Sequence, residues 1–193
     1  MMKIREAHYC RAIIICHGKS ELLLFSRLKS ILRLPIEVVG SDNGKSSVKI
    51  QGLESFLRRD EYRTKKAFCR NFFRESYRAK TFPHLITQVK VFAVMDIDDA
   101  TTDQVKRYKN CEYFKTKWLK PCCVPIYNDP NLEKTVLKIG MDVPTTNNEK
   151  AIFYQKLWAK SLQSEADVKR IYIKLKECRY TNMEKVIKYL LSI

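Results

Sequence analysis

The stretch Ile13-Ile14-Ile15-Cys16-His17-Gly18-Lys19-Ser20-Glu21 decides the predicted fold of this chain. Its run of β-branched residues is typical of a strand that is buried on both faces of a parallel sheet. A helical pattern follows from Glu21 to Leu34, and Pro35 ends it. A strand that passes through a short polar turn into a helix predicts an α/β protein.

Strand-like patterns recur at 36–39, 89–95 and 122–127, and a further helical pattern lies at 48–59. Pro125 favours an edge position for the last of these strands, because proline cannot donate a hydrogen bond to a neighbouring strand. Strands that alternate with helices are joined by crossovers and pair in parallel. We therefore predict a four-stranded, mainly parallel sheet with helices on both faces.

Residues 1–140 are predicted to form this domain, and residues 141–193 a helical C-terminal extension packed on it. Asp129 is expected to cap a helix whose first residue is Pro130 and which ends at Gly140. The polar residues 141–150 predict a linker. Apolar stripes beyond the linker predict three further helices. The inner face of the first is formed by Ile152, Phe153, Leu157 and Trp158, and that of the second by Val168, Ile171 and Leu175. A capping box at 181–184 opens the third, whose inner face is formed by Val186, Ile187 and Leu190.

The composition indicates a folded protein with an anionic partner. The 193 residues include 37 Lys and Arg against 21 Asp and Glu, for a formal net charge of +16. An excess this large favours nucleic acid, with an acidic membrane surface as the lesser alternative. No apolar run approaches the roughly 20 residues that span a bilayer, and the N-terminus does not resemble a secretory signal. The 7 cysteines are scattered without a Cys-x-x-Cys pair, so we expect free thiols in the cytoplasm rather than a zinc site.

A second acidic cluster, Asp96-Ile97-Asp98-Asp99, directly follows the apolar strand at 89–95. Ligands of open α/β sheets bind at the carboxyl ends of the strands, so this cluster and Glu21 are expected at the same edge. Asp96 and Asp98 are two residues apart and point the same way in an extended chain. Neighbouring carboxylates suit Mg²⁺ or Mn²⁺. An Asp-rich turn without a ligand is the alternative.

Three elements together resemble the Toprim domain of topoisomerases, primases and related nucleases. His17-Gly18-Lys19-Ser20-Glu21 is similar to the family's Glu-Gly-x-x-Glu, and Asp96-Ile97-Asp98 to its Asp-x-Asp. Pro130-Asn131-Leu132-Glu133 resembles an element of the small overcoming-lysogenization-defect and abortive-infection relatives. In these relatives a Pro-x-(aromatic or aliphatic)-Glu motif follows the last strand of the sheet. The resemblance covers residues 12–135.

This resemblance implies a Toprim-like fold and a metal-dependent nuclease, or a related phosphoryl-transfer protein, that acts on DNA or RNA in phage defence. It implies Mg²⁺ or Mn²⁺ as cofactor. The residues it assigns are His17, Glu21, Asp96 and Asp98 as catalytic groups, and Glu21, Asp96, Asp98 and Glu133 as metal ligands.

The chain departs from the family at His17, where the family has a glutamate. Imidazole can ligate a divalent ion or accept a proton, and it favours Mn²⁺ over Mg²⁺. The alternative is a Toprim-like protein without catalysis, which binds nucleic acid or acts as an adaptor. A third possibility is a subunit of a defence complex that is active only with a protein partner. A homodimer is a further possible assembly.

Basic residues near these motifs are candidates for phosphate binding. Lys19 and Lys45 lie in polar turns. Within 58–80 a basic stripe is predicted on one helix, and it consists of Arg63, Lys66, Arg70, Arg74 and Arg78, with Phe68, Phe72, Phe73 and Tyr77 on the opposite side as core contacts. The net charge of +16 favours phosphate binding by this stripe, and a merely solvated face is the alternative.

Overall fold

The computed structural model describes residues 10–73, 88–144 and 149–193. The strands are β1 (Ala12–Cys16), β2 (Ile36–Val39), β3 (Lys90–Asp96) and β4 (Cys123–Asn128). The helices are α1 (Lys19–Leu32), α2 (Leu53–Leu57), α3 (Asp60–Arg63), α4 (Lys65–Phe72), α6 (Thr102–Lys109), α7 (Leu132–Lys138), α8 (Lys150–Ser161), α9 (Glu165–Glu177) and α10 (Glu184–Leu190). Short 3₁₀ turns lie at η1 (Asp42–Gly44), η2 (Ile50–Gly52) and η4 (Lys120–Cys122).

The strands form a 4-stranded sheet in the order β2-β1-β3-β4, and each neighbouring pair is parallel. The predicted α/β class and parallel sheet are therefore confirmed, and the arrangement is consistent with a Toprim-like fold. Every residue of β1 is buried, as its β-branched run predicts. β4 lies at an edge, where the missing N–H of Pro125 disrupts no ladder.

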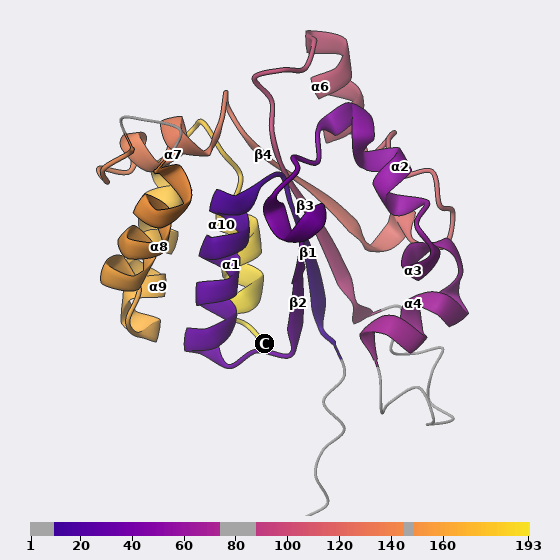
Figure 1. The fold of residues 1–193 in the computed structure, drawn as a ribbon, viewed down its shortest axis with the longest axis horizontal. Coiled ribbons are helices and arrows are strands. Elements are labelled where there is room, and N and C mark those ends of the chain that lie inside the picture. Colours follow the sequence, from indigo (N-terminus) through magenta and orange to yellow (C-terminus); the bar gives the residue numbers. More distant parts are fainter. Residues whose placement is uncertain (1–9, 74–87, 145–148) are drawn as a thin grey trace, which may run out of the picture.

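The strand order creates a switch point between β1 and β3. The chain moves from β1 outward to β2, but from β3 it moves to β4 at the opposite edge. Helix α1 accordingly covers one face of the sheet and α6 the other (Figure 1). The connections leave β1 and β3 in opposite directions, which opens a crevice at the carboxyl ends of these two strands.

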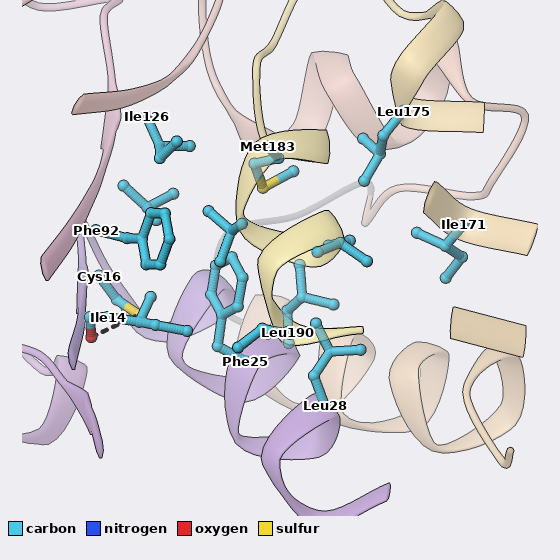
Figure 2. Close-up of a cluster of buried hydrophobic side chains, with 14 of the residues drawn as sticks. Ile14, Cys16, Phe25, Leu28, Phe92, Ile126, Ile171, Leu175, Met183 and Leu190 are labelled. Atoms are coloured by element: carbon cyan, nitrogen blue, oxygen red, sulfur yellow. Dashed lines mark hydrogen bonds between the residues drawn. The ribbon is translucent and has the colours of Figure 1, made fainter. Parts of the chain in front are cut away.

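The C-terminal helices share one buried cluster with α1 and the sheet. Figure 2 shows Ile14 and Phe92 of the sheet, Phe25 of α1, Leu175 of α9 and Leu190 of α10 in this cluster. The inner faces predicted for α9 and α10 are buried, but Ile152 of α8 is 58% exposed, so its place in the predicted stripe is wrong. In α8 the buried side chains are Tyr154 and Trp158.

The opposite face of the sheet is covered by α2, α3, α4 and α6 (Figure 1). The single basic helix predicted within 58–80 is wrong, because Thr64 has extended backbone angles and separates α3 from α4. The Thr64 hydroxyl accepts a hydrogen bond from the Ala67 amide and caps α4. Phe68 and Phe73 are buried as predicted. The predicted stripe residues Arg74 and Arg78, and the core contact Tyr77, lie outside the described residues.

Two predicted helix caps near the C-terminal half are also wrong. Helix α7 begins at Leu132, and its cap is Asn131 rather than Asp129, because the Asn131 side chain accepts from the Lys134 amide. Asp129 stays in the preceding loop, where its amide donates to the Tyr180 carbonyl. The Thr181 hydroxyl lies 2.8 Å from the Tyr127 carbonyl of β4, so it ties the chain to the sheet instead of capping α10.

In the described ranges, none of the helices is both long and apolar enough to span a bilayer.

Candidate active site at the carboxyl edge of the sheet

Glu21 is placed by the direct passage from β1 into α1. Gly18 is the N-cap of α1, and Glu21 is the third residue of its first turn. The Glu21 Oε2 atom accepts a 3.0 Å hydrogen bond from the Gly18 amide, which holds the side chain against the helix start. Only 2% of Glu21 is exposed. A carboxylate is thus held at the carboxyl end of β1.

Asp96 is the last residue of β3 and lies at the adjacent strand end. It is 6% exposed, and its Oδ1 atom accepts 3.1 Å hydrogen bonds from Asn128 Nδ2 and from the Leu132 amide. Asn128 is the last residue of β4 and pairs with Asp96 in the sheet register. The amide at the start of α7 therefore contacts Asp96 through the register of β3 with β4.

Burial and like charge act on both carboxyls. Burial raises the pKa of Asp96 to about 9, the negative charge of Glu21 adds to the rise, and the hydrogen bond from Asn128 opposes it. Burial also raises the pKa of Glu21, whereas the neighbouring His17 lowers it. Two carboxyls that are costly to ionise together favour a proton or a cation between them.

Asp98 and Glu133 lie further out and already have partners. Asp98 is exposed, and its Oδ2 atom accepts from Asn131 Nδ2 at 3.1 Å. Glu133, in the first turn of α7, has its Oε1 atom 2.5 Å from the Lys150 ammonium at the start of α8. The fully buried Tyr154 lies one turn beyond Lys150, and burial together with the charges of Glu133, Glu21 and Asp96 raises the pKa of its phenol.

These side chains surround a cleft of about 600 Å³. Every residue predicted as a catalytic group or metal ligand lines this cleft, namely His17, Glu21, Asp96, Asp98 and Glu133. Lys19 lines it as well. The Nδ1 atom of His17 is buried and has no hydrogen-bond partner in the described part of the chain. The fold thus gathers residues that lie far apart in the sequence.

The four carboxylates are donors of the type that magnesium and manganese prefer. Each of the four carboxylates has an oxygen engaged by an amide or ammonium group of the described residues 10–73, 88–144 and 149–193. In the same ranges no three His, Cys, Asp or Glu side chains are grouped closely enough to hold an ion. Mg²⁺ usually keeps several waters and binds one or two carboxylates plus phosphate oxygens. This mode of binding needs no closed cage of protein ligands.

The candidate phosphate-binding residues are divided between two surfaces. Lys19 lines the cleft, and its ammonium donates to the Asn43 carbonyl at 3.2 Å. Gly44 has a φ of +83°, and a Cβ atom there would lie 3.0 Å from the Lys19 Cα, so the loop can approach α1 only with glycine. Lys45 is exposed on this loop. Arg63, Lys66 and Arg70 are exposed on α3 and α4, away from the cleft.

Sequence reasoning missed three groups that orient the carboxylates: Asn128, Asn131 and Lys150. Asn128 is fully buried, and its Oδ1 atom lies 3.0 Å from the Thr181 hydroxyl, which directs its amide nitrogen toward Asp96. A polar residue at the end of an apolar strand was the available signal for Asn128. No local pattern marked Lys150, because only the packing of α8 brings it to Glu133.

No protein-family model, curated protein or solved structure matches the chain.

Proposed function

We propose that the protein is a metal-dependent nuclease, or a related phosphoryl-transfer protein, of the Toprim type. The observation that supports this proposal is the pair of buried carboxylates, Glu21 and Asp96, at the switch point of a parallel sheet. They line a cleft of about 600 Å³ that also contains a histidine and a lysine. In a chain of net charge +16, an anionic cleft is suited to a cation that bridges it to phosphate.

Glu21, Asp96, Asp98 and Glu133 are the candidate ligands of Mg²⁺ or Mn²⁺, which would bind one or two of these carboxylates directly and the others through water. A bound divalent ion neutralises charge on phosphate oxygens and makes water more acidic. Asn128 and the Leu132 amide orient Asp96 by binding its Oδ1 atom, and the Oδ2 atom would then serve as the ligand. Gly18 does the same for Glu21.

The remaining groups of the cleft have distinct roles in this proposal. His17 replaces the family's glutamate, and its unpartnered Nδ1 atom can ligate an ion or accept a proton from an attacking water. Lys19 attracts the phosphate, and Lys45 on the adjoining loop adds positive charge. The resemblance to the small abortive-infection relatives suggests a role in phage defence.

The second candidate function is nucleic-acid binding without cleavage, as an adaptor beside a protein partner. The observation that favours it is the existing pairing of the outer carboxylates, since Glu133 contacts Lys150 and Asp98 contacts Asn131. His17 in place of the family's glutamate points the same way. Such a protein needs no divalent ion, whereas the proposed enzyme does.

Divalent-ion binding separates the two functions. Titration calorimetry with Mn²⁺ should detect binding to the wild-type protein that is lost in the Glu21→Gln/Asp96→Asn variant. Asn retains the oxygen that accepts from Asn128 and Leu132. The matched control is Glu61→Gln/Asp103→Asn, which removes two carboxylates outside the cleft and should leave Mn²⁺ binding unchanged.

Cleavage of single- and double-stranded DNA and RNA is then assayed with Mg²⁺ and Mn²⁺. The enzyme proposal expects Mn²⁺-supported cleavage that the double variant loses. If the wild-type protein binds no divalent ion, cleaves none of these substrates, and is not activated by His17→Glu, the binding function replaces it for the isolated chain.

A further inference from the structure

Two hollows adjoin the carboxylate cleft and extend it toward α4. The first, of about 380 Å³, shares Ser47 with the cleft and is also lined by Ser41, Phe56 and Arg59. The second, of about 440 Å³, shares Phe56 and Arg59 with the first and extends to Arg70 and Asn71. We call the cleft and these two hollows the track.

Arg59 lies where the two hollows meet, and its guanidinium is held in place. It lies 4.2 Å from the centre of the Phe56 ring and donates a 3.3 Å hydrogen bond to the Ser41 hydroxyl. No ion pair is formed by Arg59 or Arg70 within the described residues. A planar cation fixed on an aromatic ring can bind phosphate and present a flat surface to a base.

The track also contains the acids Asp60 and Glu61, in the same hollow as Arg70. Carboxylates repel a phosphate backbone but accept hydrogen bonds from the amino groups of unpaired bases. A duplex hides these groups and presents a broad backbone, whereas a single strand exposes its bases and can enter narrow hollows. One fixed arginine, Arg59, and a second, exposed arginine, Arg70, therefore combine with acids in a way that suits a single strand.

We propose that a single strand of nucleic acid lies along the track, with backbone phosphates at Arg59 and Arg70 and one phosphate in the carboxylate cleft. The placement of a phosphate in the carboxylate cleft rests on the proposed nuclease function. Binding of the strand along the two hollows is independent of that function. Arg63 and Lys66 are exposed on the same segment but line none of the three hollows. They form a matched control of equal charge.

Fluorescence anisotropy in EDTA tests the track without metal or cleavage. The probes are oligo-dT and oligo-U strands of about 10 nucleotides, within the range that such grooves cover, and a duplex of the same length. Arg59→Gln/Arg70→Gln should weaken single-strand binding at least about tenfold and reduce the log–log salt slope by about 1.4, since each phosphate contact contributes about 0.7. Arg63→Gln/Lys66→Gln should change the slope by less than half as much.

A third variant guards against local unfolding around Phe56, against which Arg59 packs. Asn71→Glu adds a negative charge to the exposed wall of the outer hollow without removing Arg59, and it should also weaken single-strand binding severalfold. Circular dichroism and the melting temperature verify that all variants are folded.

The proposal is overturned if the wild-type protein binds no single strand, binds the duplex as tightly, or responds equally to both double variants. Failure of the proposed function is recognised separately. A protein that binds through Arg59 and Arg70 but never cleaves has the track without the nuclease. A protein whose cleavage is unaffected by Arg59→Gln/Arg70→Gln is a nuclease without the track.

Discussion

The buried amide of Asn128 donates a 3.1 Å hydrogen bond to the buried carboxylate of Asp96, across the paired ends of β3 and β4. Thr181 and Thr135 lie 3.0 and 3.4 Å from the Asn128 Oδ1 atom and set the orientation of its amide. The hydrogen bonding of Asp96 therefore depends on the segments that contain Asn128, Thr135 and Thr181, which meet only in the folded protein. The contribution of the Asn128–Asp96 contact to stability can be tested directly.

Replacing Asn128 with Asp should place a second carboxyl against Asp96 in a buried position. The expected loss of unfolding free energy is on the order of 3 kcal/mol at pH 8. The variant lacks the amide that donates to Asp96, and it adds a buried carboxylate that has no cationic partner. At pH 5 part of this loss should be recovered, since the two carboxyls can share a proton. Urea unfolding at both pH values measures the difference.

The control for this change is Asn131→Asp, which also adds a carboxylate beside an acid but lies at a half-exposed helix cap. Aspartate caps helices as well as asparagine does, so only a small loss is expected. An equal loss for Asn128→Asp at pH 5 and pH 8 would contradict the shared-proton explanation.

The raised pKa of Asp96 predicts that the folded protein loses stability as the pH rises. The folded state binds a proton that the unfolded state releases, so the contribution of Asp96 is complete below about pH 4 and is lost as pH rises toward its folded pKa of about 9. Without divalent ions, wild-type unfolding free energy should fall from pH 5 to pH 8 by more than about 1 kcal/mol, as one pKa unit is worth about 1.4.

Asp96→Asn keeps the acceptor oxygen and removes the charge, so it should remove much of this fall. Some of it should remain, because burial also raises the pKa of Glu21. The control Asp103→Asn removes a carboxylate from the exposed side of α6. Its unfolding free energy should fall with rising pH as that of the wild type does. If the unfolding free energy of Asp96→Asn fell between pH 5 and pH 8 as steeply as that of the wild type, Asp96 would not be the source of the pH dependence.

A divalent ion at Glu133 would have to compete with Lys150, because the Lys150 ammonium is 2.5 Å from the Glu133 Oε1 atom. Lys150→Met should therefore raise the affinity for Mn²⁺ severalfold, a gain approaching the roughly 1.4 kcal/mol that a tenfold change represents. Titration calorimetry measures it, with Lys169→Met as control, since Lys169 also pairs with a glutamate but on α9 outside the cleft. Unchanged or weaker binding in Lys150→Met would remove Glu133 from the ligand set.

His17 is expected to determine which metal supports cleavage. His17→Glu should shift the preference from Mn²⁺ toward Mg²⁺, because a hard oxygen replaces a borderline nitrogen. His17→Ala should abolish cleavage and leave nucleic-acid binding intact. Initial rates at matched concentrations of the two ions, with anisotropy as the binding measurement, test both statements. If His17→Ala cleaves normally, the imidazole is neither ligand nor base.

Much of the fold could be predicted because its signals are local. The bounds of β2 match the prediction, and the buried faces of α9 and α10 follow from apolar spacing alone. The errors occur where a side chain could choose between partners. Thr64 caps α4 and interrupts the predicted basic helix, and Thr181 contacts β4 instead of capping α10. The Thr64 cap is a local contact that competes with helix continuation, whereas the Thr181 contact depends on packing against a distant strand.

The sequence by itself determined which residues follow β1 and β3, because a buried strand and the polar turn after it are encoded within a few positions. The parallel sheet then brings Glu21 and Asp96 to one edge. Only the tertiary structure decided the partners of Asp96 and Glu133, whereas the partner of Glu21, the Gly18 amide, is local. Asn128 reaches Asp96 through the register of β3 with β4, and Lys150 reaches Glu133 through the packing of α8. Such pairings depend on how whole elements fit together, since the contacting atoms are far apart in the chain.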